Sequence, residues 1–241
     1  MKQQTKLVGE FVLIVVGVLV ALAVESALED RADDKLRDQY LSRLALDLEA
    51  DKRALLGRID FFTDVRRFSQ DVLTWLDSDA PVDQGTLLAA FYAAEVWPLA
   101  PNTSTYLDLH STGNLRLLDD IDLRMKLAIY YNKAESTEAG MNPSENYRDW
   151  IRGVIPTSVQ DMIRERCPTT DEKDLMPSGF PPCSLPEIDY DQIGQLFTQL
   201  RANPELRRVL TYRHSEIGVM IYLLRQQVRF ANEAIQKLEA Q

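Results

Sequence analysis

The sequence predicts an all-α fold: a single N-terminal transmembrane helix continuous with a long stalk helix, packed into an antiparallel helical bundle. A strongly apolar run lies between Lys6 and Glu25, and apolar residues then recur every three or four positions with no proline before Pro81. A second long stripe of the same spacing follows Asn203-Pro204. This spacing gives a helix one apolar face, and no segment alternates as a half-buried strand does.

The apolar run is LVGEFVLIVVGVLVALAV at residues 7–24, with Glu10 as its one ionisable residue. As a helix it would measure about 27 Å, close to the hydrocarbon thickness of a bilayer. We therefore expect a short cytoplasmic tail at 1–6, a transmembrane helix at 7–26 and an extracytoplasmic helical domain at 27–241. A cleaved signal peptide is the alternative, because the start is basic and Ala21-Leu22-Ala23 resembles a cleavage site.

The segment from about residue 28 to 78 predicts one long helix that stands up from the membrane as a stalk. Its apolar residues fall on one face, while charged residues fill the others. They are Leu41, Leu44, Leu48, Leu55, Ile59, Phe62, Val65, Phe68, Val72 and Leu76.

Prolines and capping residues divide the middle of the chain into shorter helices. The predicted helices are 83–97, 103–110, 121–139 with Asp119 as its cap, one opening at Asn142-Pro143 and one from Pro156 to Cys167. Asn203-Pro204 then opens the last long helix, whose stripe of Ile217, Ile221, Leu224, Val228, Ala231, Ile235 and Leu238 keeps a heptad spacing. We expect it to pack antiparallel on the stalk.

Cys167 and Cys183 are the two cysteines, and they bracket a proline-rich loop at 167–186. Two cysteines flanking an irregular loop suit a disulfide in an oxidising compartment, worth about 3 kcal/mol for a loop of this size. Two free thiols in a cytosolic domain are the alternative. Basic residues flank the apolar run almost equally, so the cysteines favour a cytoplasmic N-terminus in the bacterial inner membrane and a periplasmic domain.

The composition of the chain limits the classes of partner that the protein is expected to bind. The chain of 241 residues has 37 acidic and 27 basic side chains, a formal charge of -10, with 45% hydrophobic residues. The hydrophobic fraction is that of a folded protein. A net acidic surface repels phosphate backbones, so we expect no nucleic-acid partner.

Two motifs stand in order along the chain. The first is Gly9-Glu10 before FVLIVVGVLVAL, followed by a charged helix with Tyr40-Leu41 and Asp47. The second is Tyr106-x-x-Leu-x-x-x-Gly-Asn-Leu, followed by the stretch 123–131. Together they resemble a bacterial family of unknown function, in which a Gly-Glu-led membrane helix precedes a helical domain. Family members continue with Asn-rich sequence and a Trp, whereas this chain has Glu25-Ser26-Ala27-Leu28. The resemblance implies a membrane protein and no activity.

The apolar run offers a face for helix contact. Glu10 lies one turn inside it, where it either reaches the headgroups or makes a polar contact with another helix. Gly17 and Ala21 form a small-xxx-small pair that lets two helices approach closely. The lipid bilayer and either a second copy of the chain or another membrane protein are the expected partners.

The stretch from Tyr106 to Tyr131 is the candidate ligand pocket, because it gathers polar and aromatic groups: Tyr106, His110, Asn114, Arg124, Tyr130 and Tyr131. The competing interpretation is a core with hydrogen-bonded tyrosines and a structural arginine.

No motif points to catalysis. The sequence has no glycine-rich phosphate loop, no Gly-x-Ser-x-Gly and no His-Glu-x-x-His, and its two histidines and two cysteines have no metal-ligand spacing. We predict no catalytic residue, metal or cofactor. The first hypothesis is a membrane-anchored interaction or scaffold protein, as an oligomer or an accessory subunit of a membrane complex. The second is a periplasmic sensor or carrier of a small molecule or peptide, and an enzyme ranks third.

Overall fold

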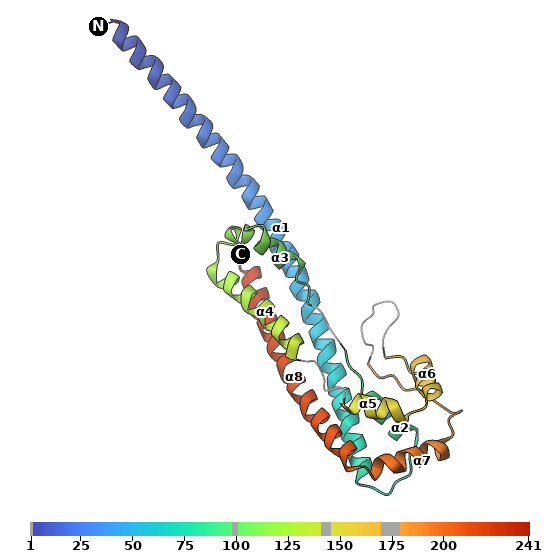
Figure 1. Cartoon of the computed structure of the whole chain (residues 1–241). Helices are drawn as coiled ribbons and strands as arrows, with labels where there is room; N and C mark the ends of the chain where they lie inside the picture. Colours follow the sequence, from blue (N-terminus) through green and yellow to red (C-terminus); the bar gives the residue numbers. More distant parts are fainter. Residues whose placement is uncertain (1, 98–100, 141–145, 170–178) are drawn as a thin grey trace.

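The computed structural model describes residues 2–97, 101–140, 146–169 and 179–241 (Figure 1). The side chains of residues 2–12, 138–140 and 146 are outside that description. All regular elements of the described chain are helices, and it contains no strand. Its elements are α1 (Lys2–Leu76), α2 (Gln84–Tyr92), α3 (Ser104–Ser111), the 3-10 turn η1 (Asn114–Leu117), α4 (Ile121–Gly140), α5 (Asn146–Val154), α6 (Thr157–Arg166), α7 (Tyr190–Arg201) and α8 (Pro204–Glu239).

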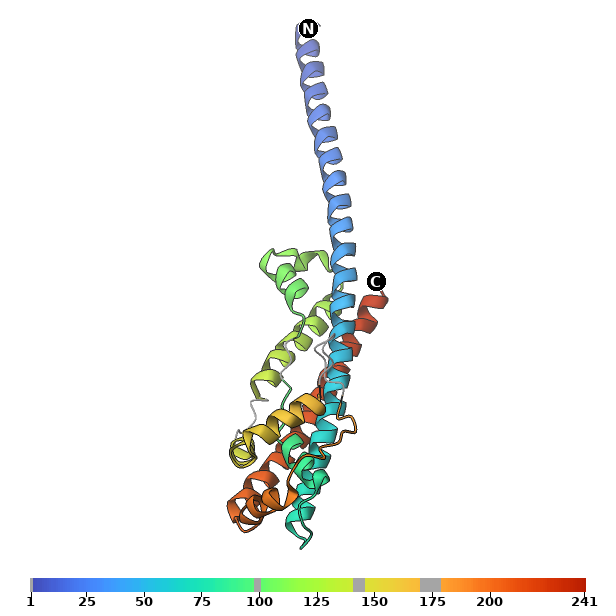
Figure 2. The same ribbon diagram turned by 90° about the vertical axis from the view of Figure 1, so that its right-hand side faces the viewer.

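Helix α1 runs for 75 residues without a break. Its N-terminal part projects away from all other elements, as both views show (Figure 1, Figure 2). Large apolar side chains from Leu13 to Val24 are therefore exposed, with Leu13 at 73% and Val24 at 55%. Within the described residues, no helix is apolar enough over a sufficient length to cross a membrane. The predicted span at 7–26 begins in residues 7–12, whose side chains lie outside the description.

The rest of α1 forms the body of the bundle with α8. The two helices run antiparallel side by side, and the C-terminus ends beside the middle of α1 (Figure 1). Both predicted stripes face inward: Leu44, Leu48, Leu55, Ile59, Phe62, Val65 and Val72 of α1 are buried, as are Ile217, Ile221, Leu224, Ala231, Ile235 and Leu238 of α8. Helix α4 packs on α8 and completes this core. The predicted antiparallel bundle is confirmed.

A second core lies at the end of the bundle that is far from the N-terminus. Helices α2, α5, α6 and α7 pack there around the last turns of α1 and the start of α8 (Figure 2). Trp75 meets Phe197 of α7 edge to face, with ring centroids 5.8 Å apart. Sequence reasoning missed α7, although Asp189 caps it and Ile193, Phe197 and Leu200 form its buried face.

Two predicted helix boundaries were wrong. The helix expected at 83–97 ends at Tyr92, because the chain turns through the buried Ala93 and Ala94. The cap of α4 is Asp120 rather than Asp119, since the Asp120 carboxylate accepts hydrogen bonds from the backbone N–H groups of Asp122 and Leu123. The expected start at Asn142-Pro143 lies outside the described residues.

Candidate functional site

The residues predicted for helix contact lie on the projecting part of α1. The side chain of Glu10 is outside the described residues. Gly17 faces open space, since a Cβ added there would meet nothing within 4 Å, and Ala21 is exposed. Within the part of the chain that the structure describes, nothing covers the face of Gly17 and Ala21.

Three of the predicted pocket residues gather where α3 and α4 meet. Tyr106 of α3 stacks on Tyr131 of α4, with ring centroids 4.4 Å apart and planes 16° apart. Tyr130 meets Tyr131 edge to face at 4.9 Å. His110 lies at the edge, with its ring 6.5 Å from that of Tyr106, and its side chain is exposed. The rings of Tyr106 and Tyr131 are in stacking contact, so no ligand fits between them.

A buried polar network ties this aromatic group to α1. Asp51, which is 3% exposed, accepts a hydrogen bond from the Tyr130 hydroxyl at 2.7 Å. Its other carboxylate oxygen accepts from the backbone N–H of Asn102 at 2.9 Å and from the Asn102 side-chain amide at 2.6 Å. Gln227 of α8 donates to the backbone carbonyl of Tyr130. One carboxylate thus joins α1, α4 and the segment that leads into α3.

Burial dominates the electrostatics of this network. It raises the pKa of Asp51, although the hydrogen bonds from Asn102 and Tyr130 act in the opposite direction. Burial also raises the pKa of Tyr131, with smaller contributions from the nearby Asp51 and Asp47. The buried hydroxyl of Tyr131 has no hydrogen-bond partner among the described residues, so this ring contributes to the core through its stacking on Tyr106.

Asn114 and Arg124 do not join the network. Asn114 donates to the hydroxyl of Tyr40, which in turn donates to Asp108 at 2.9 Å. Arg124 keeps a buried Nε with no hydrogen-bond partner among the described residues. The cavity beside Asp51 and Tyr130 has a volume of about 10 Å³, which is room for at most one water. The geometry favours a packed core over a ligand pocket.

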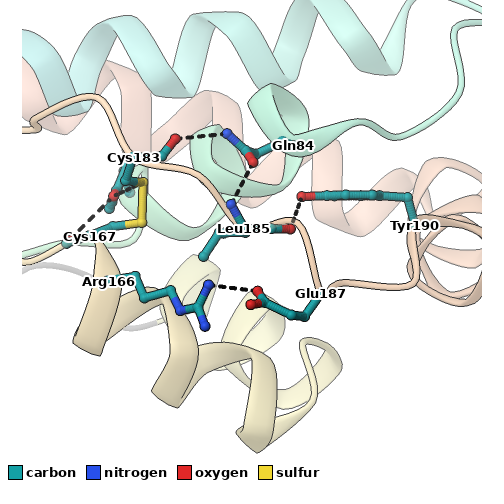
Figure 3. The surroundings of a disulfide bond; sticks show 8 residues. Gln84, Arg166, Cys167, Cys183, Leu185, Glu187 and Tyr190 are labelled. Carbon is teal, nitrogen blue, oxygen red and sulfur yellow. Dashed lines mark hydrogen bonds and ion pairs between the residues drawn. A yellow bond between two sulfur atoms is a disulfide. The ribbon is translucent and has the colours of Figure 1, made fainter.

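The predicted disulfide is present between Cys167 and Cys183, whose Cα atoms lie 5.4 Å apart (Figure 3). The Gln84 side chain donates to the carbonyl of Cys183 and accepts from the N–H of Leu185. Arg166 forms an ion pair with Glu187 at 2.7 Å. These contacts hold the segment from Cys183 to Glu187 against α2 and α6.

A second buried polar cluster was not predicted. It surrounds Glu95, just after the end of α2, and draws its arginines from α5 and α8. Arg152 pairs with the Glu95 carboxylate at 2.5 Å and lies over the ring of Phe91 at 3.3 Å. Arg213, which is 2% exposed, donates to the Glu95 carbonyl at 2.8 Å, and Arg148 donates to the Ala94 carbonyl. The arginines thus satisfy backbone carbonyls just after the end of α2, while one nitrogen of Arg213 and two of Arg152 are buried with no hydrogen-bond partner among the described residues.

Among the described side chains, no three His, Cys, Asp or Glu come close enough together to hold a metal ion. Comparison with family models, with curated proteins and with solved structures gave no match to this chain. The family resemblance therefore stays a prediction, and the function must be argued from the geometry.

Proposed function

We propose that the protein is a membrane-anchored helical interaction protein, a scaffold or accessory subunit whose bundle lies in the periplasm. The observation behind this proposal is helix α1. One unbroken helix supplies both the projecting apolar segment and the central element of the bundle.

The exposed segment has an unfavourable energy in water. Nine large apolar side chains between Leu13 and Val24 are 39–73% exposed. Fully burying one such side chain is worth about 1.5–3 kcal/mol, so covering this set would contribute on the order of 10 kcal/mol. A partner that removes these side chains from water is therefore strongly favoured.

The distribution of these side chains favours lipid as the partner. Val18, Leu19, Val20, Leu22 and Val24 point in all directions around the helix, since successive residues are 100° apart. A single partner helix or a groove covers one side, whereas a bilayer covers all of them. Residues 7–12 extend the same apolar run toward the N-terminus.

The Cys167–Cys183 disulfide supports a periplasmic position for the bundle, because such bonds persist in oxidising compartments. The second hypothesis, a ligand sensor built on Tyr106 to Tyr131, draws little support from a cavity of about 10 Å³.

Membrane fractionation of the full chain expressed in a bacterium tests the proposal. We expect the protein to stay in the membrane after alkaline carbonate extraction. The variant Val16→Lys with Leu19→Lys should move to the soluble fraction, whereas Val219→Lys, at an exposed apolar position of α8, should not. Recovery of the unaltered protein in the soluble fraction would refute the anchor.

Two further measurements test on which side of the membrane the bundle lies and whether the protein associates with itself or with a partner. Without reductant, a thiol reagent should not label Cys167 or Cys183 in protein taken directly from cells. Labelling of both would place the bundle in the cytoplasm. In mild detergent, the measured mass should exceed that of one chain, 27.5 kDa, or a membrane protein should co-purify. A monomer that brings no partner would contradict the interaction role.

A further inference from the structure

A groove of about 490 Å³ lies between α1 and α8, away from the predicted pocket. This volume is in the range of small-molecule sites. Its lining is basic, with Arg66 and Arg67 from α1 and His214 and Arg225 from α8, next to the exposed ring of Tyr222.

The charges in this groove are only partly balanced. Arg67 pairs with Asp64 at 3.2 Å and with Asp71 at 3.6 Å. Arg66 and Arg225 make neither an ion pair nor a side-chain hydrogen bond with any described residue. Two guanidinium groups without carboxylate partners thus face one groove, although the chain has a net charge of -10.

The packing holds Arg66 and His214 in place. The Arg66 guanidinium lies against Gly218 of α8, where an added Cβ would be 3.5 Å from the guanidinium carbon. The Ser69 hydroxyl donates to the Arg66 carbonyl at 2.6 Å. Its oxygen then accepts from Nδ1 of His214, 2.8 Å away.

We propose that this groove binds a small soluble dianion, such as an oxyanion or a dicarboxylate, between Arg66 and Arg225. Guanidinium groups bind carboxylate and phosphate oxygens in pairs, and an unpaired cation gains more from an anion than one already neutralised. His214 stands 11 residues before Arg225 on α8, about 16 Å along the helix, so it would sense the anion through the charge of Arg66 rather than touch it.

The position of the groove separates a soluble anion from a lipid headgroup. If α1 crosses the membrane as proposed, Arg66 stands some 40 residues beyond the end of the apolar run. At 1.5 Å per residue this places the groove about 60 Å from the bilayer surface. A headgroup of the anchoring membrane does not reach it. This step alone depends on the proposed anchor.

The two histidines provide a direct test by NMR. Burial and the charge of Arg66 lower the pKa of His214. The charged and titratable groups that line the groove together with His214 are Arg66, Arg67 and Asp71 from α1 and Tyr222 and Arg225 from its own helix. A dianion bound between the arginines should raise the pKa of His214, while the exposed His110 serves as the internal control.

The experiment uses the full chain in detergent with labelled histidine. Sodium sulfate and sodium succinate are compared with sodium chloride at equal ionic strength. We expect sulfate or succinate to raise the pKa of His214 alone, with saturation. Equal shifts of His110 and His214, or a response identical to that of chloride, would overturn the proposal.

Variants add an independent measurement of affinity by calorimetry. Arg66→Gln with Arg225→Gln should weaken binding at least tenfold. The matched control, Arg164→Gln with Arg229→Gln, removes two exposed arginines outside the groove and should bind as the parent does. Unchanged affinity in the first pair would overturn the site, and if that pair does not fold, the histidine titration of the unaltered protein still decides. Failure of the membrane test leaves the binding results unaffected, so the two proposals fail separately.

Discussion

Replacing Asp51 with alanine should destabilise the protein more than any single change in the surface ion pairs. The substitution removes the acceptor of three hydrogen bonds, from the Tyr130 hydroxyl, the Asn102 amide and the Asn102 backbone N–H. Tyr130 is 1% exposed, so its hydroxyl loses its protein acceptor inside the core once Asp51 is lost. The damage therefore comes mainly from a buried donor left without a partner.

The magnitude follows from the burial of each group. An unsatisfied buried hydroxyl costs about 1–3 kcal/mol, and hydrogen bonds to a charged group are worth about 1.5–3 kcal/mol each. Asn102 is exposed, so water replaces part of its loss. Removing a buried carboxylate also recovers its desolvation cost. We expect a net loss of about 3 kcal/mol, which lowers Tm by roughly 6–12 °C for a domain of this size.

Urea unfolding of the full chain in detergent, followed by circular dichroism, measures this loss. A double-mutant cycle with Tyr130→Phe should give a coupling free energy of about 1–2 kcal/mol, because both changes remove the same bond. Asp51→Asn, which keeps the shape and part of the hydrogen bonding, should cost less than half as much. A loss below about 0.5 kcal/mol for Asp51→Ala, or no coupling with Tyr130→Phe, would refute the buried network.

The same carboxylate predicts a pH dependence. Because burial raises the pKa of Asp51 in the folded state, the folded protein holds this proton more tightly than the unfolded chain does. The stability gained from the protonated form is complete below the ordinary value of 3.8 and is lost as the pH rises through the raised pKa. The free energy of unfolding of the parent should therefore fall relative to Asp51→Asn as the pH increases from about 4. If the free energy of unfolding of the parent instead rises relative to that of Asp51→Asn, the hydrogen bonds lower the pKa of Asp51 more than burial raises it.

Three other changes test separate parts of the fold by the same unfolding measurement. Replacing Cys167 and Cys183 together by serine should cost about 3 kcal/mol, because the bond closes a loop of 16 residues; no loss would mean that the thiols are reduced in the purified protein. Asn203→Ala should cost about 1 kcal/mol, since its side chain caps α8 by accepting from the N–H of Glu205. Gly218→Ala should stabilise α8 by about 0.5–1 kcal/mol, because an added methyl meets Arg66 at an ordinary contact distance; a loss would indicate that Arg66 lies closer to the helix than described.

The long helices were predictable because their periodicity is sustained and their ends are marked. Asn203-Pro204 opens α8 where expected, and the side chain of Asn203 makes the predicted cap. Short helices offer fewer residues to establish a period. The segment of α7 follows a proline-rich loop, and its three buried residues were not enough to separate it from that loop. Trp97 extended the apparent pattern of α2, yet it packs outside the helix against Gly57.

The candidate site was harder to predict because its partners are remote in the chain. Tyr106, Tyr130 and Tyr131 were recognised as a group, since they are close in the sequence and aromatic. Asp51 and Asn102, which decide the role of Tyr130, carry no local signal. On the sequence alone, a hydrogen-bonded core is favoured over a pocket in this stretch. Only the packing distances distinguish the two.

The groove arginines show the same limit more strongly. Arg66 falls on the polar face of one amphipathic helix and Arg225 on that of another, where each looks like an ordinary solvated charge. Their shared groove exists only because α1 and α8 pack antiparallel in one particular register. A shift of that register by one turn would move Arg225 about 5 Å along α1 and change its distance from Arg66. The hydrophobic stripes set the register, so the core indirectly determines which charges meet on the surface.

The register of α1 also determines what the proposed anchor does to the bundle. Its core begins at Tyr40, 16 residues beyond Val24, which corresponds to about 24 Å of helix above the apolar segment. The intervening turns of α1 contain no break, and Asp33 in these turns forms an ion pair with Arg116 of η1. A rotation of the helix inside the membrane would therefore be passed to the bundle, since a continuous helix resists twisting. If two anchors meet through Gly17 and Ala21, that contact selects which faces of the two bundles point toward each other.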